Sequence, residues 1–223
     1  MCIRDRLSID VDWLLPGSRY HLKELNNLFF SKCETVEKIV FGRYHHQILQ
    51  CPKVIESNNI ILHNIDHHHD LVYQFWQEEA IKKGLASHGS WVGNLIHENK
   101  IDEYFWYKNI DSDIIVPDCF LAWSMIFKKP AIKYCIEETL EEAWRLNYDL
   151  IFVAFSPETL DKKLYCVYDT YVDYCKYMYK EKTTINKVIP ELPNVPILMN
   201  KYCLLYTSPS PRDATLSRMP SSA

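Results

Sequence analysis

The sequence lacks several features that mark large classes of protein. It has no signal peptide and no apolar stretch near the roughly 18 residues of a membrane-spanning helix. Its eight cysteines form no Cys-x-x-Cys pair, and several lie in apolar patterns typical of buried thiols. Its net charge of −4 gives no electrostatic reason to expect a nucleic-acid partner. We therefore expect a cytoplasmic protein that binds neither membrane nor nucleic acid.

The two ends of the chain differ from its middle. Residues 1–6, "MCIRDR", and residues 203–223 resemble the translated ends of a sequencing-library adapter. We exclude both from fold reasoning, which leaves the natural start and end open. Residues 7–202 then have the length of one ordinary domain, with no internal repeat and no low-complexity linker.

Strand and helix patterns alternate along this middle part. Apolar runs typical of strands lie at 7–13, 36–42, 58–66, 102–108, 121–129 and 148–155. Helical patterns lie at 19–30 after a Ser18 cap, at 71–84 ending in Gly84, at 90–99, at 135–147, and at 158–181 after a Ser156 cap and Pro157. This alternation predicts a three-layer α/β/α domain with a mostly parallel sheet.

Acidic residues and histidines gather where three predicted strands end. In open α/β sheets the functional crevice lies beyond the carboxyl ends of the strands. Alternate residues of a strand point to one side, so the acids of each motif are expected to project together. The candidate ligands at these ends are Asp10, Asp12, His45, His46, Asp66, His68 and Asp70.

Several carboxylates in one crevice would repel each other unless a cation neutralised them. Carboxylate and imidazole ligands without thiolates suit Mn²⁺, Fe²⁺ or Zn²⁺. The number of aspartates favours two ions that share bridging carboxylates, with a hydroxide held between them for attack on carbon or phosphorus. Taken singly, each motif has an ordinary explanation as surface acids or a solvated histidine run. Together they favour a metal site, because each follows a separate apolar strand.

Three stretches resemble motifs of the arginase/deacetylase-like ureohydrolase superfamily. "SIDVDWLLP" resembles the arginase pattern S-F-D-V-D-x-x-D-P, and "NIDHHHDL" resembles D-A-H-x-D. "FGRYHHQIL" is more weakly similar to the G-G-D-H-S segment. The nearest branch is the peptide-arginase-like proteins, in which the D-x-D segment also comes early. The resemblance covers residues 8–71 and implies an arginase-like fold with two metal ions, most plausibly Mn²⁺, with Fe²⁺ and Zn²⁺ as alternatives.

The resemblance also implies a role for each acid. Asp66 would bridge both ions, with His68 on one ion and Asp70 on the other. Asp10 would be a second bridging ligand, and Asp12 a terminal one.

The remaining roles concern histidines and catalysis. One of His45 and His46 would complete the shell of the first ion, and the apolar "QIL" that follows favours His46. Asp70 is a candidate catalytic residue that would hydrogen-bond the bridging hydroxide. His88 is a candidate proton shuttle, although a helix cap or a buried structural histidine explains it equally well.

Two departures limit this transfer of roles. The familiar arginases carry the D-x-D motif late in the chain, whereas here it comes first. Ala154 stands where a guanidinium-binding glutamate is expected, which argues against free arginine as substrate, because a cation in a dry pocket needs a compensating charge. Glu98, Asp118 and Glu158 are candidate substitutes.

The function predicted from these motifs is metal-dependent hydrolysis of a C–N bond, by attack on a guanidinium or amide carbon in a small molecule or peptide. One alternative is a two-metal phosphoesterase or nuclease, because the same ligand types serve phosphoryl transfer. Another is a non-catalytic binding protein with a degenerate metal site, in which "EYFWYKN" at 103–109 forms a recognition surface.

Overall fold

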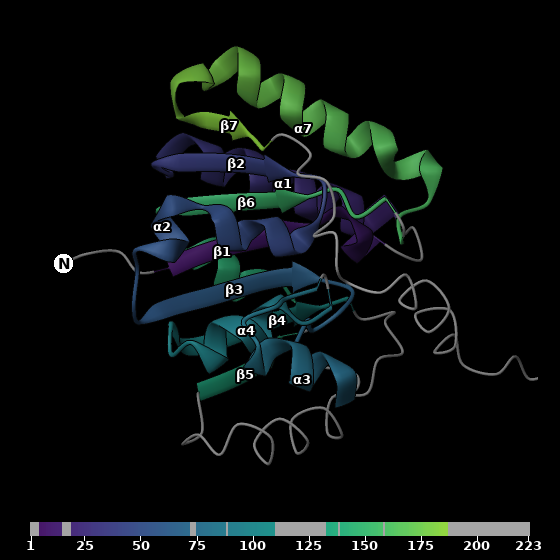
Figure 1. Ribbon diagram of the computed structural model, residues 1–223. Helices are drawn as coiled ribbons and strands as arrows, with labels where there is room; N and C mark the ends of the chain where they lie inside the picture. Colours follow the sequence, from purple (N-terminus) through teal and green to yellow (C-terminus); the bar gives the residue numbers. More distant parts are fainter. Residues whose placement is uncertain are drawn as a thin grey trace, which may run out of the picture. The chain divides into compact units, whose positions relative to one another are not determined.

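The computed structural model describes residues 5–14, 19–71, 75–87, 89–109, 133–137, 139–157 and 159–186. All lie in the first of the two units into which the chain divides, Met1–Lys187. Within the described residues seven strands form one sheet in the order β5-β4-β3-β1-β6-β2-β7, and every neighbouring pair is parallel (Figure 1). The strands are β1 (Asp5–Asp10), β2 (Lys38–Gly42), β3 (Ile60–Asp66), β4 (Ile101–Lys108), β5 (Lys133–Glu137), β6 (Leu150–Ala154) and β7 (Thr183–Ile185).

Helices cover both faces of this sheet, which confirms the three-layer α/β/α arrangement. The α-helices are α1 (Arg19–Thr35), α2 (Pro52–Ile55), α3 (Phe75–Lys82), α4 (Trp91–His97), α6 (Glu141–Arg145) and α7 (Tyr165–Met178). Short 3₁₀ helices are η1 (Val11–Leu14), η2 (His45–Gln50), η3 (Lys162–Leu164) and η4 (Lys180–Lys182). No helix within the described ranges is both long and apolar enough to cross a membrane.

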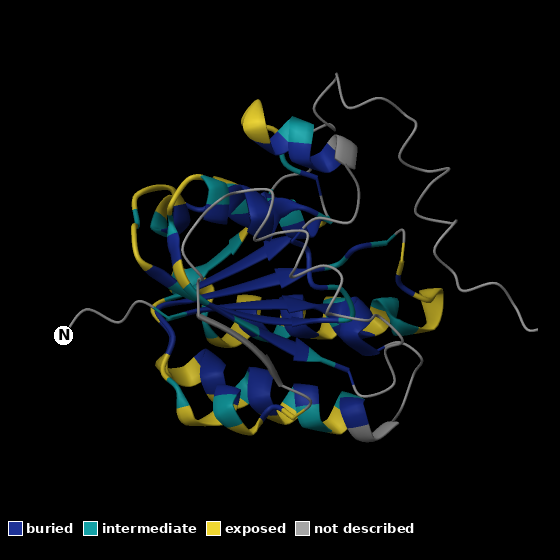
Figure 2. Cartoon of the chain, turned by 90° about the horizontal axis from the view of Figure 1, so that it is seen from below, coloured by how far each residue is buried: buried dark blue, intermediate teal, exposed yellow. Residues whose placement is uncertain are grey.

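The two faces of the sheet carry separate hydrophobic cores. On β1, Leu7 and Ile9 point into the core that includes α1, α6 and α7. On β6, Leu150 and Phe152 belong to the other core, with η2, α2 and α4. Because helices cover both faces of the central strands, side chains on both faces are buried (Figure 2). The sequences of these strands are therefore continuous apolar runs.

The central strands end at one level. Asp10 of β1 pairs in register with Ala154 of β6, which also pairs with Gly42 of β2. On the other side of β1, Ile9 pairs with Ile65 of β3. The loops that follow β1, β2, β3 and β6 therefore start side by side at the carboxyl edge of the sheet.

Two predicted elements differ from the structure. The helical pattern at 135–147 is divided, because β5 ends at Glu137 and the short helix α6 begins at Glu141. Pairing with β4 extends the sheet through Glu137 and overrides the helical pattern of the sequence at this point. The predicted strand at 121–129 and the Ser18 cap lie outside the described residues.

The helix predicted from 158 begins later. After β6 the chain forms a turn and the 3₁₀ helix η3, and α7 starts only at Tyr165. Ser156 has a φ of +43°, whereas an N-cap residue has an extended conformation. Its hydroxyl donates a hydrogen bond to Asp10 at the end of the neighbouring strand β1, and this contact takes the place of the helix cap.

Candidate metal centre

The two acids of the D-x-D motif reach the carboxyl edge in different ways. Asp10 is the last residue of β1, and Asp12 lies in the 3₁₀ helix η1. The Asp12 amide donates a hydrogen bond to Asp10 Oδ1 at 3.1 Å. A tight turn, rather than the predicted continuation of the strand to 13, thus brings both carboxylates to the same side.

A turn also brings the D-x-H-x-D residues together. β3 ends at Asp66, and the His68 amide donates to Asp66 Oδ1 at 2.8 Å. Asp70 has a φ of +51°, a left-handed conformation that redirects the chain. Strand alternation was therefore the wrong reason for the grouping of these side chains, although their grouping was predicted.

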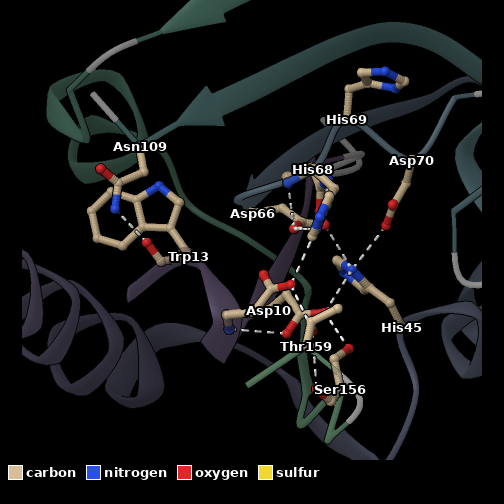
Figure 3. A network of polar contacts seen from close by, with 12 residues as sticks. Asp10, Trp13, His45, Asp66, His68, His69, Asp70, Asn109, Ser156 and Thr159 are labelled. Carbon is tan, nitrogen blue, oxygen red and sulfur yellow. Dashed lines mark hydrogen bonds and ion pairs between the residues drawn. The ribbon is translucent and has the colours of Figure 1, made fainter. Parts of the chain in front are cut away.

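His45 lies at the centre of the first group of ligands. Its Nδ1 is 2.9 Å from Asp66 Oδ2, 3.1 Å from Asp70 Oδ2 and 3.4 Å from Asp10 Oδ2 (Figure 3). Its Nε2 is 2.5 Å from Ser8 Oγ, so one ring nitrogen faces the carboxylates and the other faces a hydroxyl. Asp10, His45 and Asp66 place one ligand atom each within 4.8 Å of one another, a spacing suited to one metal ion.

His68 forms a second group on the other side of Asp66. Its Nδ1 is 3.1 Å from Asp12 Oδ2 and 3.7 Å from Asp66 Oδ1. Asp12, Asp66 and His68 also place ligand atoms within 4.8 Å of one another. Asp66 therefore directs one oxygen toward each group, the arrangement expected of a carboxylate that bridges two ions.

The two groups differ in exposure. The side chain of His45 is 1% exposed, whereas that of His68 is 32% exposed. The acids around them are all buried. The first position is thus enclosed by protein, and the second opens toward solvent beside His68.

The charge of the cluster favours a bound cation. Four carboxylates, those of Asp10, Asp12, Asp66 and Asp70, face two imidazoles, so when all four acids are ionised the negative charge exceeds what both rings can supply. Asp12 Oδ1 is also buried and has no hydrogen-bond partner among the described residues, which is costly for a carboxylate oxygen. Oxygen and imidazole donors with an unpaired oxygen fit a divalent ion such as Mn²⁺.

These charges shift the pKa values of the ligands in opposite directions. Burial alone would lower the pKa of His45, but hydrogen bonds to Asp66 and Asp70 raise it well above its usual value. His68 behaves alike, because the charge of Asp12 outweighs burial and raises its pKa. Burial would raise the pKa of Asp66, yet hydrogen bonds from both rings lower it well below the usual range.

Burial raises the pKa of two other acids, Asp10 and Asp70. Burial and then the charge of Asp12 raise the pKa of Asp10 well above its usual value. Burial and then the charge of Asp66 raise the pKa of Asp70 to about 7. A metal ion that binds the Asp70 carboxylate would therefore compete with a proton near neutral pH.

Helix α4 supports Asp70 from the side. Trp91 Nε1 donates to Asp70 Oδ2 at 2.5 Å, and the Val92 amide donates to the Asp70 carbonyl oxygen at 3.1 Å. A Cβ atom on Gly93 would lie 2.2 Å from the Leu71 carbonyl oxygen, so only glycine permits this close approach. The helix therefore fixes both the backbone and the carboxylate of Asp70.

Aromatic residues of β4 support the turn at residues 66–70 that carries these ligands. Trp106 Nε1 donates to the Asp66 carbonyl oxygen at 2.9 Å, and Tyr104 Oη donates to the His69 carbonyl oxygen at 2.7 Å. Both side chains are buried, as is Tyr107. The recognition surface proposed for 103–109 is therefore wrong for these three aromatics, which form core, and Tyr104 and Trp106 also hold the turn at 66–70.

The flanking histidines of the run have other positions. His69 is fully buried and points away from the acids in Figure 3, with its ring edge-on to Trp106 at a centroid distance of 5.7 Å. Burial lowers its pKa to about 3, so the ring is neutral. His67 is half-buried, and its ring is edge-on to that of His68. His69 is thus a buried side chain that lies apart from the ligand cluster.

The structure brings six of the candidate ligands into one cluster. They are Asp10, Asp12, His45, Asp66, His68 and Asp70. His45, rather than the favoured His46, has its ring nitrogen among the carboxylates, while His46 is half-buried and stacks on Tyr44 at 5.7 Å. The apolar residues after the pair did not decide the choice, because the 3₁₀ helix η2 begins at His45 and turns that ring inward.

The remaining candidates cannot be joined to this cluster. His88, Asp118 and Glu158 lie outside the described residues, so their roles stay predictions. Glu98 is exposed and follows α4 at the end opposite Trp91, roughly 10 Å along the helix axis. That distance argues against Glu98 as a substrate-binding acid beside the metal positions.

Four supporting residues were not predicted from the sequence. They are Ser8, Trp91, Ser156 and Thr159, whose side chains contact His45, Asp70, Asp10 and Asp12 respectively. The only local signal was a hydroxyl or indole close to a strand or helix end. Such signals are common, and the contacts span up to 147 residues of sequence.

A scan of family models and searches of curated proteins and solved structures gave no match. The assignment of a function to this chain therefore depends on the geometry of the cluster itself.

Proposed function

We propose that this chain is a dinuclear metal-dependent hydrolase, similar to the arginase-like ureohydrolases, that cleaves a C–N bond at a guanidinium or amide carbon. The observation that carries the proposal is the position of Asp66. Its two oxygens face two separate ligand groups, one with Asp10 and His45 and the other with Asp12 and His68. A carboxylate shared in this way is typical of two-metal hydrolases.

Each residue would have a defined task. Asp66 would hold both ions, and Asp10 and Asp70 would complete the enclosed position with His45. Asp12 and His68 would hold the ion at the open position. Two bound divalent ions, most plausibly Mn²⁺, would lower the pKa of a water molecule and orient it for attack. Substrate would approach beside His68, the cluster member most open to solvent.

The charge around the cluster favours a cationic or neutral substrate over a phosphate ester. In the described part of the chain, the ion pairs of the four acids are made with histidine. Two-metal phosphoesterases and nucleases commonly add cationic side chains that stabilise their anionic substrate. The described ion pairs of these four acids include no lysine or arginine, which favours a guanidinium or amide substrate. Ala154 is buried and uncharged, so recognition of the rest of the substrate would come from other residues.

Metal content and product identity test this proposal. Purified protein reconstituted with Mn²⁺ should contain about two ions per chain by elemental analysis, and it should release urea or ammonia from a panel of guanidino and amide compounds, including arginine-containing peptides. Turnover of phosphodiesters alone would assign the site to phosphoryl transfer. Tight binding of two ions without turnover of any of these compounds would indicate a binding protein. A chain that binds no metal after reconstitution would refute all three.

The location and partners of the chain stay predictions from the sequence. The cytoplasm is the expected location, a small molecule or peptide the expected substrate, and neither nucleic acid nor membrane an expected partner. Cell fractionation of the tagged chain would test the location.

A further inference from the structure

The turn after β6 contacts both acids of the D-x-D motif. The Ser156 hydroxyl donates to Asp10 Oδ2, and Thr159 Oγ1 lies 2.9 Å from Asp12 Oδ2 (Figure 3). Two hydroxyls three positions apart thus face two carboxylates two positions apart. Thr159 Oγ1 is also 3.1 Å from the Ser156 carbonyl oxygen, but a charged acceptor forms the stronger hydrogen bond.

The backbone fixes this turn independently of the acids. The Phe155 amide donates to the Gly42 carbonyl oxygen at 3.1 Å, and the Ser156 amide donates to that of Arg43 at 2.8 Å. The amides of Thr159 and Leu160 both donate to the Ser156 carbonyl oxygen at 3.1 Å. The two hydroxyls therefore stand on a framework tied to the end of β2.

Ser156 occupies a conformation that serine rarely adopts. Its φ of +43° lies in the left-handed region, which glycine and asparagine enter more readily. Backbone strain of this kind persists where surrounding contacts hold it in place, often beside a functional site. Here the side chain is buried, and its hydroxyl contacts Asp10.

We propose that Ser156 and Thr159 are positioning residues that set the relative metal affinity of the two positions. The inference rests on the proposed function. A donor bound to one lone pair of a carboxylate fixes the direction of the others, and partners of this kind tune metal affinity. Ser156 acts on Asp10, which belongs to the enclosed position, and Thr159 acts on Asp12, which belongs to the open one. Each hydroxyl thus tunes mainly one position.

The sharper test is Thr159→Val, which keeps the shape of the side chain and removes its hydroxyl. Mn²⁺ titration followed by the electron paramagnetic resonance of free Mn²⁺ should show affinity at the open position lowered about 10- to 100-fold, with the enclosed position unchanged. The spectrum at low temperature should change from a coupled pair to a single ion at limiting Mn²⁺. Thr159→Ser should restore both readouts. Thr170→Val, a matched change on α7 whose hydroxyl donates to the Cys166 carbonyl oxygen at 2.6 Å, should alter neither.

Ser156→Gly separates the hydroxyl from the strain. Glycine suits the positive φ, so the metal-free variant should unfold at the wild-type temperature or above. Its Mn²⁺ affinity at the enclosed position should nevertheless fall about 10- to 100-fold. Wild-type affinities and a coupled-pair spectrum in both variants, or no rescue by Thr159→Ser, would overturn the inference and leave the proposed function standing. A wild-type chain that binds no Mn²⁺ would overturn both.

Discussion

Buried charge occurs at both edges of the sheet, but it is compensated differently. At the amino edge, Arg6 is buried and forms an ion pair with Asp149, and Lys53 Nζ lies 4.0 Å from the second oxygen of that acid. At the carboxyl edge, the carboxylates of the ligand cluster outnumber its two imidazoles.

The difference separates a structural cluster from a ligand site. A buried carboxylate is tolerated when the chain itself supplies the opposite charge, as Arg6 does for Asp149. At the carboxyl edge the described residues supply too little positive charge for four ionised acids, and none of them pairs with Asp12 Oδ1. The missing compensation is what a pair of cations would provide. Five predictions test this comparison.

The largest expected effect is that of Asp66→Asn. This change removes the charge of the one acid shared by both ligand groups, so we expect loss of Mn²⁺ binding at both positions. Elemental analysis after reconstitution measures the Mn²⁺ content of the variant. Asp149→Asn is the matched control, because it neutralises a buried aspartate at the other edge and should keep the wild-type metal content. Equal metal content in both variants would show that the two edges do not differ as described.

The next largest effect should be the pH dependence of Mn²⁺ binding at the carboxyl edge. The pKa of Asp70 is raised to about 7, and those of His45 and His68 are raised well above their usual value, so Mn²⁺ must displace protons. We expect affinity to rise at least about tenfold per pH unit from pH 5 to 7, because each displaced proton contributes a factor of about ten per unit. Titration calorimetry in buffers of different ionisation enthalpy measures both the affinity and the protons released.

The metal-free protein should show the opposite trend. Asp70 binds a proton more tightly in the folded chain than in the unfolded one, and so do the two histidines. The folded state then carries more protons, so its stability falls as pH rises from 5 toward 8. Thermal unfolding with and without Mn²⁺ should give curves that diverge with rising pH. Parallel curves would contradict the link between protons and metal.

The sequence predicts the location of this site better than its details. Alternating strands and helices, with acids at the ends of apolar runs, are local signals, and they correctly placed Asp10, Asp12 and Asp66 at one edge of a parallel sheet. The direction of each side chain depends on turns instead. Whether His45 or His46 points inward follows from the start of η2, which no local pattern indicated.

Long-range contacts explain the other failures. Ser156 has the pattern of a helix cap, but its hydroxyl bonds to Asp10, which is 146 positions away. Lys133–Glu137 pairs with β4 although the sequence around it favours a helix. In both cases a partner that is distant in sequence outweighs a local preference worth less than about 1 kcal/mol per residue.

Arg6→Met should weaken the amino edge while sparing the carboxyl edge. Removing one member of a buried ion pair leaves its partner uncompensated, which typically costs about 3 kcal/mol or more. Lys53 lies near enough to Asp149 to offset part of this, so we expect a loss of about 2 kcal/mol in the free energy of unfolding. Urea denaturation measures this loss, and Mn²⁺ content should not change. The result is informative for another reason, because Arg6 belongs to the adapter-like segment and yet forms part of β1.

Trp91→Phe should have the smallest effect and test whether the enclosed position depends on its neighbours. In the wild-type chain the centroids of the Trp91 and His45 rings are 4.7 Å apart. The substitution keeps an aromatic ring at this place but removes the N–H that donates to Asp70 Oδ2. Asp70 would then lose one of the contacts that orient it toward His45 Nδ1. We expect Mn²⁺ affinity at the enclosed position to fall about tenfold. The open position should keep its affinity, because the indole N–H of Trp91 bonds to Asp70 and not to Asp12 or His68. A two-site Mn²⁺ titration resolves the two affinities. Equal weakening of both positions would mean that Trp91 supports the cluster as a whole, through packing, rather than through its hydrogen bond to Asp70.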